Sequence, residues 1–301
     1  MCNLIVMCGL QGSGKSTIAE ELKNGISNCE IVSSDQIRKE YNHKIGNDEV
    51  FKIYYERARK FLNEGKSVIL DATNISIKSR RHIFEKLKGI DCEKICYIVN
   101  TPINICAERL IERNKTNEQE EVPLEVLYKY ERSFEIPFME EGWNDIVVHD
   151  LRIFNPLEYY AIIDKMKRFD QKNPHHKFTL GEHNNQLEEC LKSYGFPEDV
   201  GTLHDIGKLF VQKIDKDGIA HYYNHSNIGA YYLLSNLGLI KTADYLDLIF
   251  YVNYHMMPFD WDTDKARAKW KSRFGEHKFE MLEILNKGDK IASGTQNKNN
   301  E

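Results

Sequence analysis

Apolar and polar positions along residues 1–150 follow two alternating patterns. Five short apolar runs predict buried strands, at residues 4–8, 31–33, 67–70, 94–99 and 146–148. Four segments between them carry apolar residues at helical spacing, at 15–23, 50–63, 79–87 and 103–114. Strands that alternate with helices are typical of a parallel sheet with helices on both faces, so an α/β fold is expected here.

The pattern changes near residue 150, where strand-like runs almost cease. Later helical segments are predicted around Pro156 and at 158–169, 187–194, 228–237, 243–254 and 279–285. We therefore predict an α/β domain over 1–152 and an all-α domain over 153–301. The most apolar late stretch, 245–257, contains Asp247, Asn253 and His255 and falls short of the ~18 apolar residues of a membrane span, so no membrane partner is expected.

Composition narrows the classes of function. Hydrophobic residues make up 41% and charged residues 29%, which excludes a disordered or collagen-like chain. The 41 Lys and Arg face 46 Asp and Glu, and the net charge of −5 offers no bulk positive field to attract nucleic acid. A nucleic-acid substrate would need a local basic groove. Seven cysteines without a Cys-x-x-Cys pair suggest reduced thiols and a cytoplasmic location rather than a disulfide framework.

Residues 9–16 read GLQGSGKS and fit the pattern G-x-x-x-x-G-K-[ST]. The segment directly follows a predicted strand and opens a predicted helix, as a phosphate-binding loop must. Its lysine supplies charge for the β- and γ-phosphates, and its serine can hold Mg²⁺. The sequence therefore predicts ATP or another nucleoside triphosphate, with Mg²⁺, at Gly12, Ser13, Gly14, Lys15, Ser16 and Thr17.

Candidate groups for the acceptor follow the next two strands. Asp35 could accept a proton from an attacking hydroxyl, and Arg38, one helical turn later, could hold a substrate phosphate. The alternative for Asp35 is a helix N-cap. Asp71 ends a predicted strand, where it could hold Arg38 or a metal-bound water, or only cap the strand end.

Two arginines lie four residues apart on the predicted helix at 103–114. Arg109 and Arg113 share one face, and a polar stretch follows them before Val122. This arrangement suggests a lid that brings a guanidinium to the transferring phosphate. The alternative is an ordinary solvated helix face.

Together these motifs resemble the polynucleotide 5′-kinase family of P-loop phosphotransferases over about residues 1–150. The resemblance is carried by the phosphate loop, SSDxxR at 33–38, DATN at 71–74, Arg-Asn-Lys at 113–115, Val-Pro at 122–123 and the stretch 134–137. It implies that Asp35 is the general base for a 5′-hydroxyl and that Arg38 contacts the substrate's 3′-side phosphate. The family's lid carries a further basic residue, whereas residues 116–121 read TNEQEE, so the lid role falls to Arg113, with Arg109.

Imidazole and carboxylate groups mark the second half of the chain. The candidates are His183, the adjacent pair His204 and Asp205, His225, His255 and Asp289. Such a donor set suits one or two Mn, Fe, Co, Ni or Mg ions, unlike a Cys-rich structural zinc site. Lys208, one turn after the pair, could neutralise a phosphate oxygen. Taken alone, a single histidine such as His183 also fits a surface or core position.

In order and spacing these residues resemble the HD phosphohydrolase superfamily over about 170–295. Segments 173–183 and 221–230 further resemble the HD domains attached to tRNA nucleotidyltransferases, a branch that acts on phosphoesters including 2′,3′-cyclic phosphates. The resemblance implies a main metal site at His183, His204, Asp205 and Asp289. His225 and His255 would complete a second.

The leading hypothesis is a bifunctional enzyme that heals RNA or DNA ends. It would phosphorylate 5′-hydroxyl ends and clear 2′,3′-cyclic, 2′- or 3′-phosphates, and an RNA ligase would join the healed ends. Two alternatives are a small-metabolite or nucleoside kinase fused to an HD nucleotidase, and an HD phosphohydrolase regulated by nucleotide. The choice of acceptor, the nucleotide donor, the number of metal ions and the oligomeric state stay open.

Overall fold

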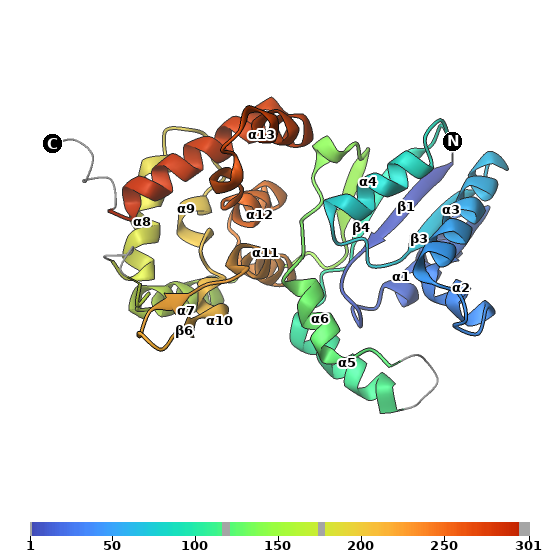
Figure 1. Cartoon of the computed structure of the whole chain (residues 1–301), viewed down its shortest axis with the longest axis horizontal. Coiled ribbons are helices and arrows are strands. Elements are labelled where there is room, and N and C mark those ends of the chain that lie inside the picture. Colours follow the sequence, from blue (N-terminus) through green and yellow to red (C-terminus); the bar gives the residue numbers. More distant parts are fainter. Residues whose placement is uncertain (1, 116–120, 174–177, 295–301) are drawn as a thin grey trace. The chain divides into compact units, whose positions relative to one another are not determined.

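The computed structural model describes residues 2–115, 121–173 and 178–294 (Figure 1). The chain forms two compact units. Unit 1 comprises Met1–Tyr130 and Pro137–Leu151, and unit 2 comprises Glu131–Ile136 and Arg152–Glu301. The short segment 131–136 thus belongs to unit 2, although the kinase resemblance draws on residues 134–137.

Unit 1 is built on a five-stranded parallel sheet, which confirms the predicted α/β organisation. The strand order is β2-β3-β1-β4-β5. The strands are β1 (Asn3–Cys8), β2 (Cys29–Ser33), β3 (Ser67–Asp71), β4 (Glu93–Ile98) and β5 (Asp145–Val148). Since β1 pairs with β3 in parallel, with Val6 opposite Leu70, the chain leaves β1 beside the carboxylate that ends β3. This edge of the sheet carries the phosphate loop.

Helices cover the sheet and connect its strands. They are α1 (Lys15–Gly25), α2 (Ser34–Glu40), α3 (Asn47–Asn63), α4 (Ile77–Lys86), α5 (Ile103–Lys115) and α6 (Leu124–Glu131), with a 3₁₀ turn η1 (Met139–Glu141). Ile18 of α1 packs on Ile5 and Met7 of β1. Leu4 and Val6, which point to the opposite face of β1, are buried as well, so neither face of the central strand meets water.

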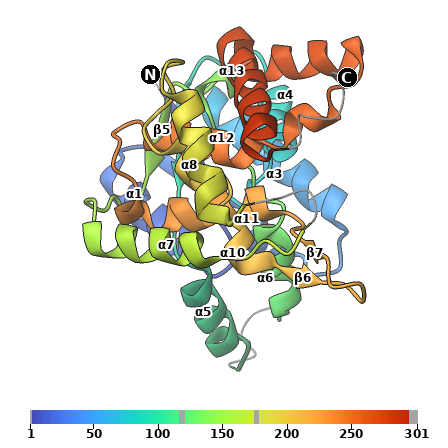
Figure 2. The same ribbon diagram turned by 90° about the vertical axis from the view of Figure 1, so that its left-hand side faces the viewer.

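Unit 2 is mainly helical. Its helices are α7 (Pro156–Arg168), α8 (Leu180–Leu191), α9 (Val200–Leu203), α10 (Lys208–Val211), α11 (His225–Ser235), α12 (Tyr245–Tyr254) and α13 (Asp264–Ala292), with 3₁₀ turns η2 (Leu237–Leu239) and η3 (Met257–Asp260). Helix α8 packs against α7, α9 and α13, and α11 packs against α12 (Figure 2). The long α13 is broken at Gly275, whose φ of 78° is not helical.

One feature of unit 2 corrects the sequence prediction. The strands β6 (Lys213–Ile214) and β7 (Ala220–His221) pair in an antiparallel hairpin, so the unit is not all-α. Two-residue strands are too short to leave an alternating pattern, which explains why the prediction missed them. Most of TNEQEE (116–120) and residues 174–177 of the quoted segment 173–183 lie outside the described residues.

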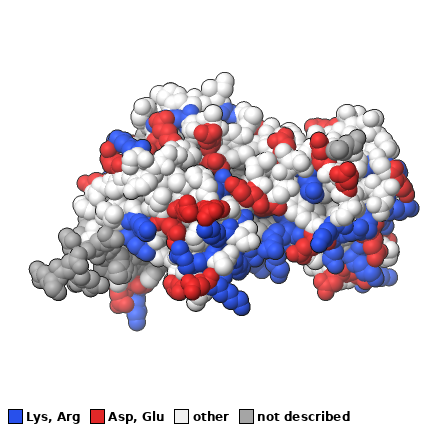
Figure 3. Space-filling view, turned by 90° about the horizontal axis from the view of Figure 1, so that it is seen from above, with Lys and Arg blue, Asp and Glu red and all other residues white. Residues whose placement is uncertain are grey.

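Charge on the surface is mixed, as the composition predicts. On the face shown in Figure 3, Lys and Arg side chains are interspersed with Asp and Glu, and neither sign covers the face alone. Among the described residues, no helix combines the length and apolar character needed to cross a membrane.

Candidate functional site

The phosphate loop owes its shape to its glycines. Gly12 has φ 75° and Gly14 has φ 96°, values that side-chain-bearing residues rarely adopt. A Cβ added at Gly12 would also lie 2.5 Å from the carbonyl oxygen of Cys106. The Thr101 hydroxyl donates to the carbonyl of Ser13 at 2.8 Å and fixes the loop from its outer side. The loop is therefore preformed by α5 and by the segment before it.

Lys15 and Ser16 begin helix α1 beside the end of β3. The buried Lys15 ammonium donates to the carbonyl of Leu10 at 2.8 Å, and burial lowers its pKa against the opposing pull of Asp71. The Ser16 hydroxyl donates to Asp71 Oδ2 at 2.7 Å. Asp71 thus stands behind the serine expected to hold Mg²⁺, which places a carboxylate where that cation would need it. The exposed Thr17 follows on the first turn of α1.

Asp35 and Arg38 lie together on α2. The helix N-cap is Ser33, whose hydroxyl accepts from the backbone N–H of Gln36, so the capping alternative for Asp35 is wrong. The Asp35 side chain is 79% exposed and pairs with Arg38 at 2.7 Å. Arg38 also donates to Asn47 Oδ1 at 3.0 Å. The guanidinium is bound by these two groups and Asp71 accepts from Ser16, so of the two partners suggested for Asp71, Arg38 is wrong and the metal-bound water stays a prediction.

The two arginines of α5 differ in their surroundings. Arg109 Nη1 donates to the carbonyls of Ser13, at 3.1 Å, and Gly12, at 3.4 Å, so it braces the phosphate loop. The solvated-face alternative is therefore wrong for Arg109. Arg113 is half-buried one turn further on. The Asn114 side chain exchanges hydrogen bonds with the backbone of Val122, which connects the end of α5 to residue 122.

A buried ion pair supports this edge of the sheet and was not predicted. Arg80 and Glu141 are 0% and 1% exposed and meet through two contacts of 2.6 Å. Arg80 also donates to the carbonyl of Asn74, and the Asn74 amide donates to the carbonyl of Met7 at 2.8 Å. The pair therefore holds the DATN segment against the end of β1. The available signal was that Arg80 occupies an apolar-face position of α4, three residues after Ile77.

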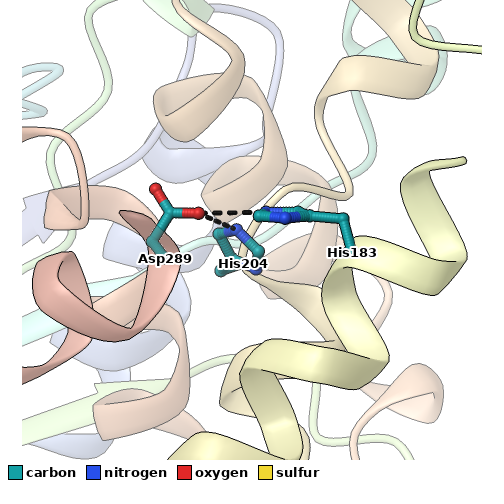
Figure 4. Close-up of side chains that lie close together, drawn as sticks. All are labelled: His183, His204 and Asp289. Carbon is teal, nitrogen blue, oxygen red and sulfur yellow. Dashed lines mark ion pairs between the residues drawn. The ribbon is translucent and has the colours of Figure 1, made fainter. Parts of the chain in front are cut away.

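Six side chains of unit 2 converge into two groups of potential metal donors. His183 lies on α8, His204 and Asp205 follow α9, His225 opens α11, His255 follows α12, and Asp289 lies on α13. One group is His183, His204 and Asp289; the other is Asp205, His225 and His255. Within each group the donor atoms lie within 4.8 Å of one another. Figure 4 shows the first group, with the three side chains pointing toward one another from their separate elements.

Asp205 faces both groups. Its Oδ2 lies 3.2 Å from His204 Nε2 and 3.7 Å from His183 Nε2. Its Oδ1 lies 3.1 Å from His225 Nε2 and 3.5 Å from His255 Nε2. Asp289 Oδ1 completes the first group at 2.9 Å from His183 Nε2. A carboxylate between two sets of donors is the arrangement that a two-ion site requires.

Three of the imidazoles are oriented by backbone carbonyls. The Nδ1 atoms of His204, His225 and His255 lie 2.8, 2.7 and 2.8 Å from the carbonyls of Gly201, Tyr222 and Val252 respectively. A carbonyl only accepts, so each Nδ1 carries a proton, and each Nε2 is turned toward the cluster. The buried His204 Nε2 lies 3.2 Å from Asp205 Oδ2 and 3.6 Å from Asp289 Oδ1. These observations fit metal ligation.

The charges of the cluster depend on one another. Burial opposes ionisation of Asp205, but His204 and Lys208 outweigh it and hold its pKa well below the ordinary value. Burial likewise disfavours the charged His204, yet Asp205 and Asp289 raise its pKa to about 10. Burial lowers the pKa of His255. A divalent cation at the cluster would supply the positive charge that His204 and Lys208 otherwise provide to these carboxylates.

A glycine brings two of the ligand segments together. A Cβ on Gly207 would lie 1.9 Å from the carbonyl oxygen of His225 and 2.8 Å from the backbone nitrogen of Gly229. Only glycine permits this approach of the chain after Asp205 to the start of α11. The glycine itself is visible in the sequence, in the run Ile-Gly-Lys. The segment that it contacts begins 18 residues later, and this contact could not be predicted from the sequence.

Lys208 lies beside the cluster, and its role toward a phosphate oxygen stays a prediction. It is buried, donates to Asp205 Oδ2 at 2.6 Å and to Gln171 Oε1 at 3.1 Å, and so is already bound within the cluster. It also lines a cavity of about 600 Å³ that reaches Asp205, His225 and Asp289. The cavity gives a substrate access to the side chains expected to hold metal.

Comparisons with known proteins concern mainly unit 1. Residues 4–137 match a family described as an AAA domain. The L-seryl-tRNA(Sec) kinase of Methanococcus maripaludis is 25% identical over 236 residues, which cover 72% of this chain and 84% of that protein. Because unit 1 ends at residue 151, this similarity extends into unit 2.

Two solved structures match part of the chain. A chain of the Pnkp1/Rnl/Hen1 RNA repair complex is 21% identical with a TM-score of 0.39, covering 43% of this chain and 42% of its own. A gluconokinase from Sinorhizobium meliloti is 20% identical with a TM-score of 0.35, covering 52% of this chain and 85% of its own. These likenesses leave the acceptor open. With the family match and the loop geometry, the chain is a P-loop kinase, a phosphotransferase.

Proposed function

We propose that this chain heals broken RNA ends with two phosphate chemistries, one in each unit. Unit 1 would transfer the γ-phosphate of ATP to a 5′-hydroxyl. Unit 2 would hydrolyse a 2′,3′-cyclic phosphate or a 2′- or 3′-phosphate. The proposal joins the kinase motifs of unit 1 to the donor cluster of unit 2.

In the kinase reaction the 5′-oxygen attacks the γ-phosphorus, the bond to the β-phosphate oxygen breaks and ADP leaves. Asp35 would take the proton of the attacking hydroxyl, a role supported by its 79% exposed side chain beyond the end of β2. Arg38, held by Asp35 and Asn47, would bind the phosphate on the 3′ side of the reacting nucleoside. Ser16, with Asp71 behind it, would hold Mg²⁺, and Lys15 would offset charge on the transferred group.

In the hydrolase reaction water adds to phosphorus and the bond to a ribose oxygen breaks. A cyclic phosphate yields a monoester, and a second hydrolysis releases inorganic phosphate. One or two divalent ions, held by the two donor groups, would supply Lewis-acid activation of water and phosphate. The backbone carbonyls fix three imidazoles, and Lys208 keeps Asp205 ionised.

The observation that carries this proposal is the position of Asp205 between the two donor groups. A buried histidine in a helical core commonly satisfies itself with one hydrogen bond. Four buried imidazole Nε2 atoms within 3.7 Å of one carboxylate have no such structural purpose, because burying so many polar groups together is costly. The HD-type hydrolase accounts for all of them.

A second candidate function follows from the similarity to the L-seryl-tRNA(Sec) kinase. That protein's name implies an acceptor hydroxyl on an amino acid carried by tRNA. The same loop and the same Asp35 could serve such an acceptor, and the similarity extends beyond unit 1. A nucleoside or another small metabolite is a further acceptor class with the same phosphate donor.

The test offers γ-labelled ATP and Mg²⁺ with three acceptors: a short 5′-hydroxyl RNA, a seryl-tRNA and a free nucleoside. Label on the RNA, reduced about 10²- to 10³-fold by Lys15→Ala, supports the proposed kinase. Label on seryl-tRNA or the nucleoside alone would refute RNA 5′-end phosphorylation and establish the other acceptor. The Arg81→Ala variant, altered at an exposed side chain, is the matched control and should label the RNA as wild type does.

A further inference from the structure

The cavity of unit 2 is larger than a phosphate group needs. Its volume of about 600 Å³ falls in the range of sites for whole small molecules. One part of its wall is the donor cluster, represented by Asp205, His225 and Asp289. Another part is the hairpin β6–β7 and the residues after it, including His221 and Tyr223. A ligand with its phosphate at the cluster would extend toward this hairpin.

Two rings of the hairpin are stacked. His221 and Tyr223 lie parallel, with an interplanar angle of 4° and centroids 5.7 Å apart. Tyr223 nevertheless remains 66% exposed, whereas its neighbour Tyr222 turns inward and donates its hydroxyl to the carbonyl of Gln171. The chain thus keeps a large flat ring in contact with water beside the cluster.

The stacked pair is held in place by the turn of the hairpin. Asp215 Oδ2 lies 2.9 Å from His221 Nε2, and its Oδ1 accepts the backbone N–H groups of Asp217 and Ile219 at 2.9 and 3.0 Å. At the other end, the Asn173 amide donates to the carbonyl of Ala220 at 2.9 Å. The Asp215 carboxylate therefore orients both the turn and the His221 ring. Because these groups are already ordered, a ligand that stacks on them would lose little binding free energy to ordering the protein.

We propose that His221 and Tyr223 form a stacking surface for the nucleobase of the substrate whose phosphate meets the donor cluster. The inference rests on the proposed hydrolase function and adds that the substrate is recognised through its base. A flat ring accepts any base, so recognition would be tolerant of sequence. Lys290, which lines the same cavity beside Phe259, adds positive charge for the phosphate side of the ligand.

The first test compares two substrates in steady-state hydrolysis with Mn²⁺. One is adenosine 2′,3′-cyclic phosphate, and the other is methyl riboside 2,3-cyclic phosphate, which has no base. Tyr223→Ala should raise KM for the adenosine substrate about tenfold, with kcat and the base-free substrate little changed. Tyr223→Phe should behave as wild type. Equal losses on both substrates, or no change on either, would overturn the stacking role.

The second test needs no hydrolysis. The probe is 2-aminopurine riboside 3′-phosphate, whose fluorescence falls when its base stacks. Wild type and Tyr223→Phe should quench the probe, Tyr223→Ala should not, and Tyr194→Ala should quench normally because that exposed ring does not line the cavity. Quenching without hydrolysis of either cyclic phosphate would remove the hydrolase proposal but keep the base site. Unchanged quenching in Tyr223→Ala would remove the base site.

Discussion

The two candidate sites are built in opposite ways. The loop of unit 1 draws its groups from eight consecutive residues, 9–16, and relies on backbone N–H groups whose direction is set by glycine conformation. The cluster of unit 2 draws six side chains from a span of 107 residues, 183–289, and relies on their donor atoms. The first site is local and depends on the backbone path. The second is distributed and depends on how helices pack.

This difference determines how each site should fail. Replacing one donor of the cluster should remove chemistry while leaving the fold intact. Changing the loop should act through backbone geometry or through its supports, such as Arg80 and Arg109. Four substitutions, from the largest expected effect to the smallest, separate these two kinds of failure.

The largest effect is expected for Asp205→Asn. The amide cannot supply charge to both donor groups, so bound metal should fall, and hydrolysis should drop by roughly a thousandfold or more, since metal activation contributes several kcal/mol. Metal content by mass spectrometry and hydrolysis of a cyclic phosphate measure the two. Asp164→Asn, at an exposed ion pair on α7, should change neither. Full metal content and full hydrolysis in Asp205→Asn would show that the cluster is not the hydrolytic site.

The next effect concerns stability. Arg80→Ala leaves the Glu141 carboxylate buried without its cation and should lower the free energy of unfolding by about 3–5 kcal/mol. Urea denaturation followed by circular dichroism measures it. The neighbouring Arg81→Ala, whose partner Glu85 lies 3.9 Å away on the surface, should cost less than about 1 kcal/mol. Equal costs for the two arginines would mean that the buried pair does not support the sheet edge.

A third substitution separates backbone conformation from close packing. Gly65→Ala, at φ 74° with open space around it, should cost about 1–2 kcal/mol of stability and leave ATP affinity unchanged. Gly12→Ala, at φ 75°, adds a clash with the carbonyl of Cys106, should cost about 1–3 kcal/mol more and should abolish ATP binding. Thermal unfolding and calorimetric titration of ATP measure both. If Gly12→Ala bound ATP normally, the loop could not depend on this glycine.

The smallest effect is expected for Arg109, which supports the phosphate loop. Arg109→Ala removes the hydrogen bonds to the carbonyls of Gly12 and Ser13 and should weaken ATP binding by about tenfold, the value of a charged hydrogen bond that is partly exposed. Arg109→Lys should recover part of the loss. Calorimetric titration gives the affinities. A Lys variant no better than Ala would assign the contribution to the shape of the guanidinium rather than its charge.

Features formed by residues close together in the chain were predicted well from the sequence. The five strands, their parallel arrangement and the phosphate loop follow from short apolar runs and from the glycine pattern. Ser33, not Asp35, proved to be the cap of α2, because both polar residues, two positions apart, fit the same pattern and only the backbone distinguishes them. The roles of Asp35, Arg38 and Arg113 in transfer stay predictions.

Features made by distant residues were largely beyond the sequence. The six donor residues were named, and the family resemblance already separated His225 and His255 from the other four. The position of Asp205 between the two groups depends on helix packing. The Arg80–Glu141 pair joins residues 61 apart, and the transfer of 131–136 to unit 2 depends on contacts such as the hydrogen bond from Ile136 N–H to Asn253. Neither leaves a periodic signal in the chain.

The proposed function requires that one chain carry two separable end-healing activities. The most direct test uses a single RNA with a 5′-hydroxyl and a 2′,3′-cyclic phosphate, incubated with ATP, Mg²⁺ and Mn²⁺, with both ends read by mass spectrometry. Wild type should yield a 5′-phosphate and a free 2′,3′-diol. Lys15→Ala should heal only the 3′ end and Asp205→Asn only the 5′ end. An RNA left unchanged at both ends by the wild-type protein would contradict the account.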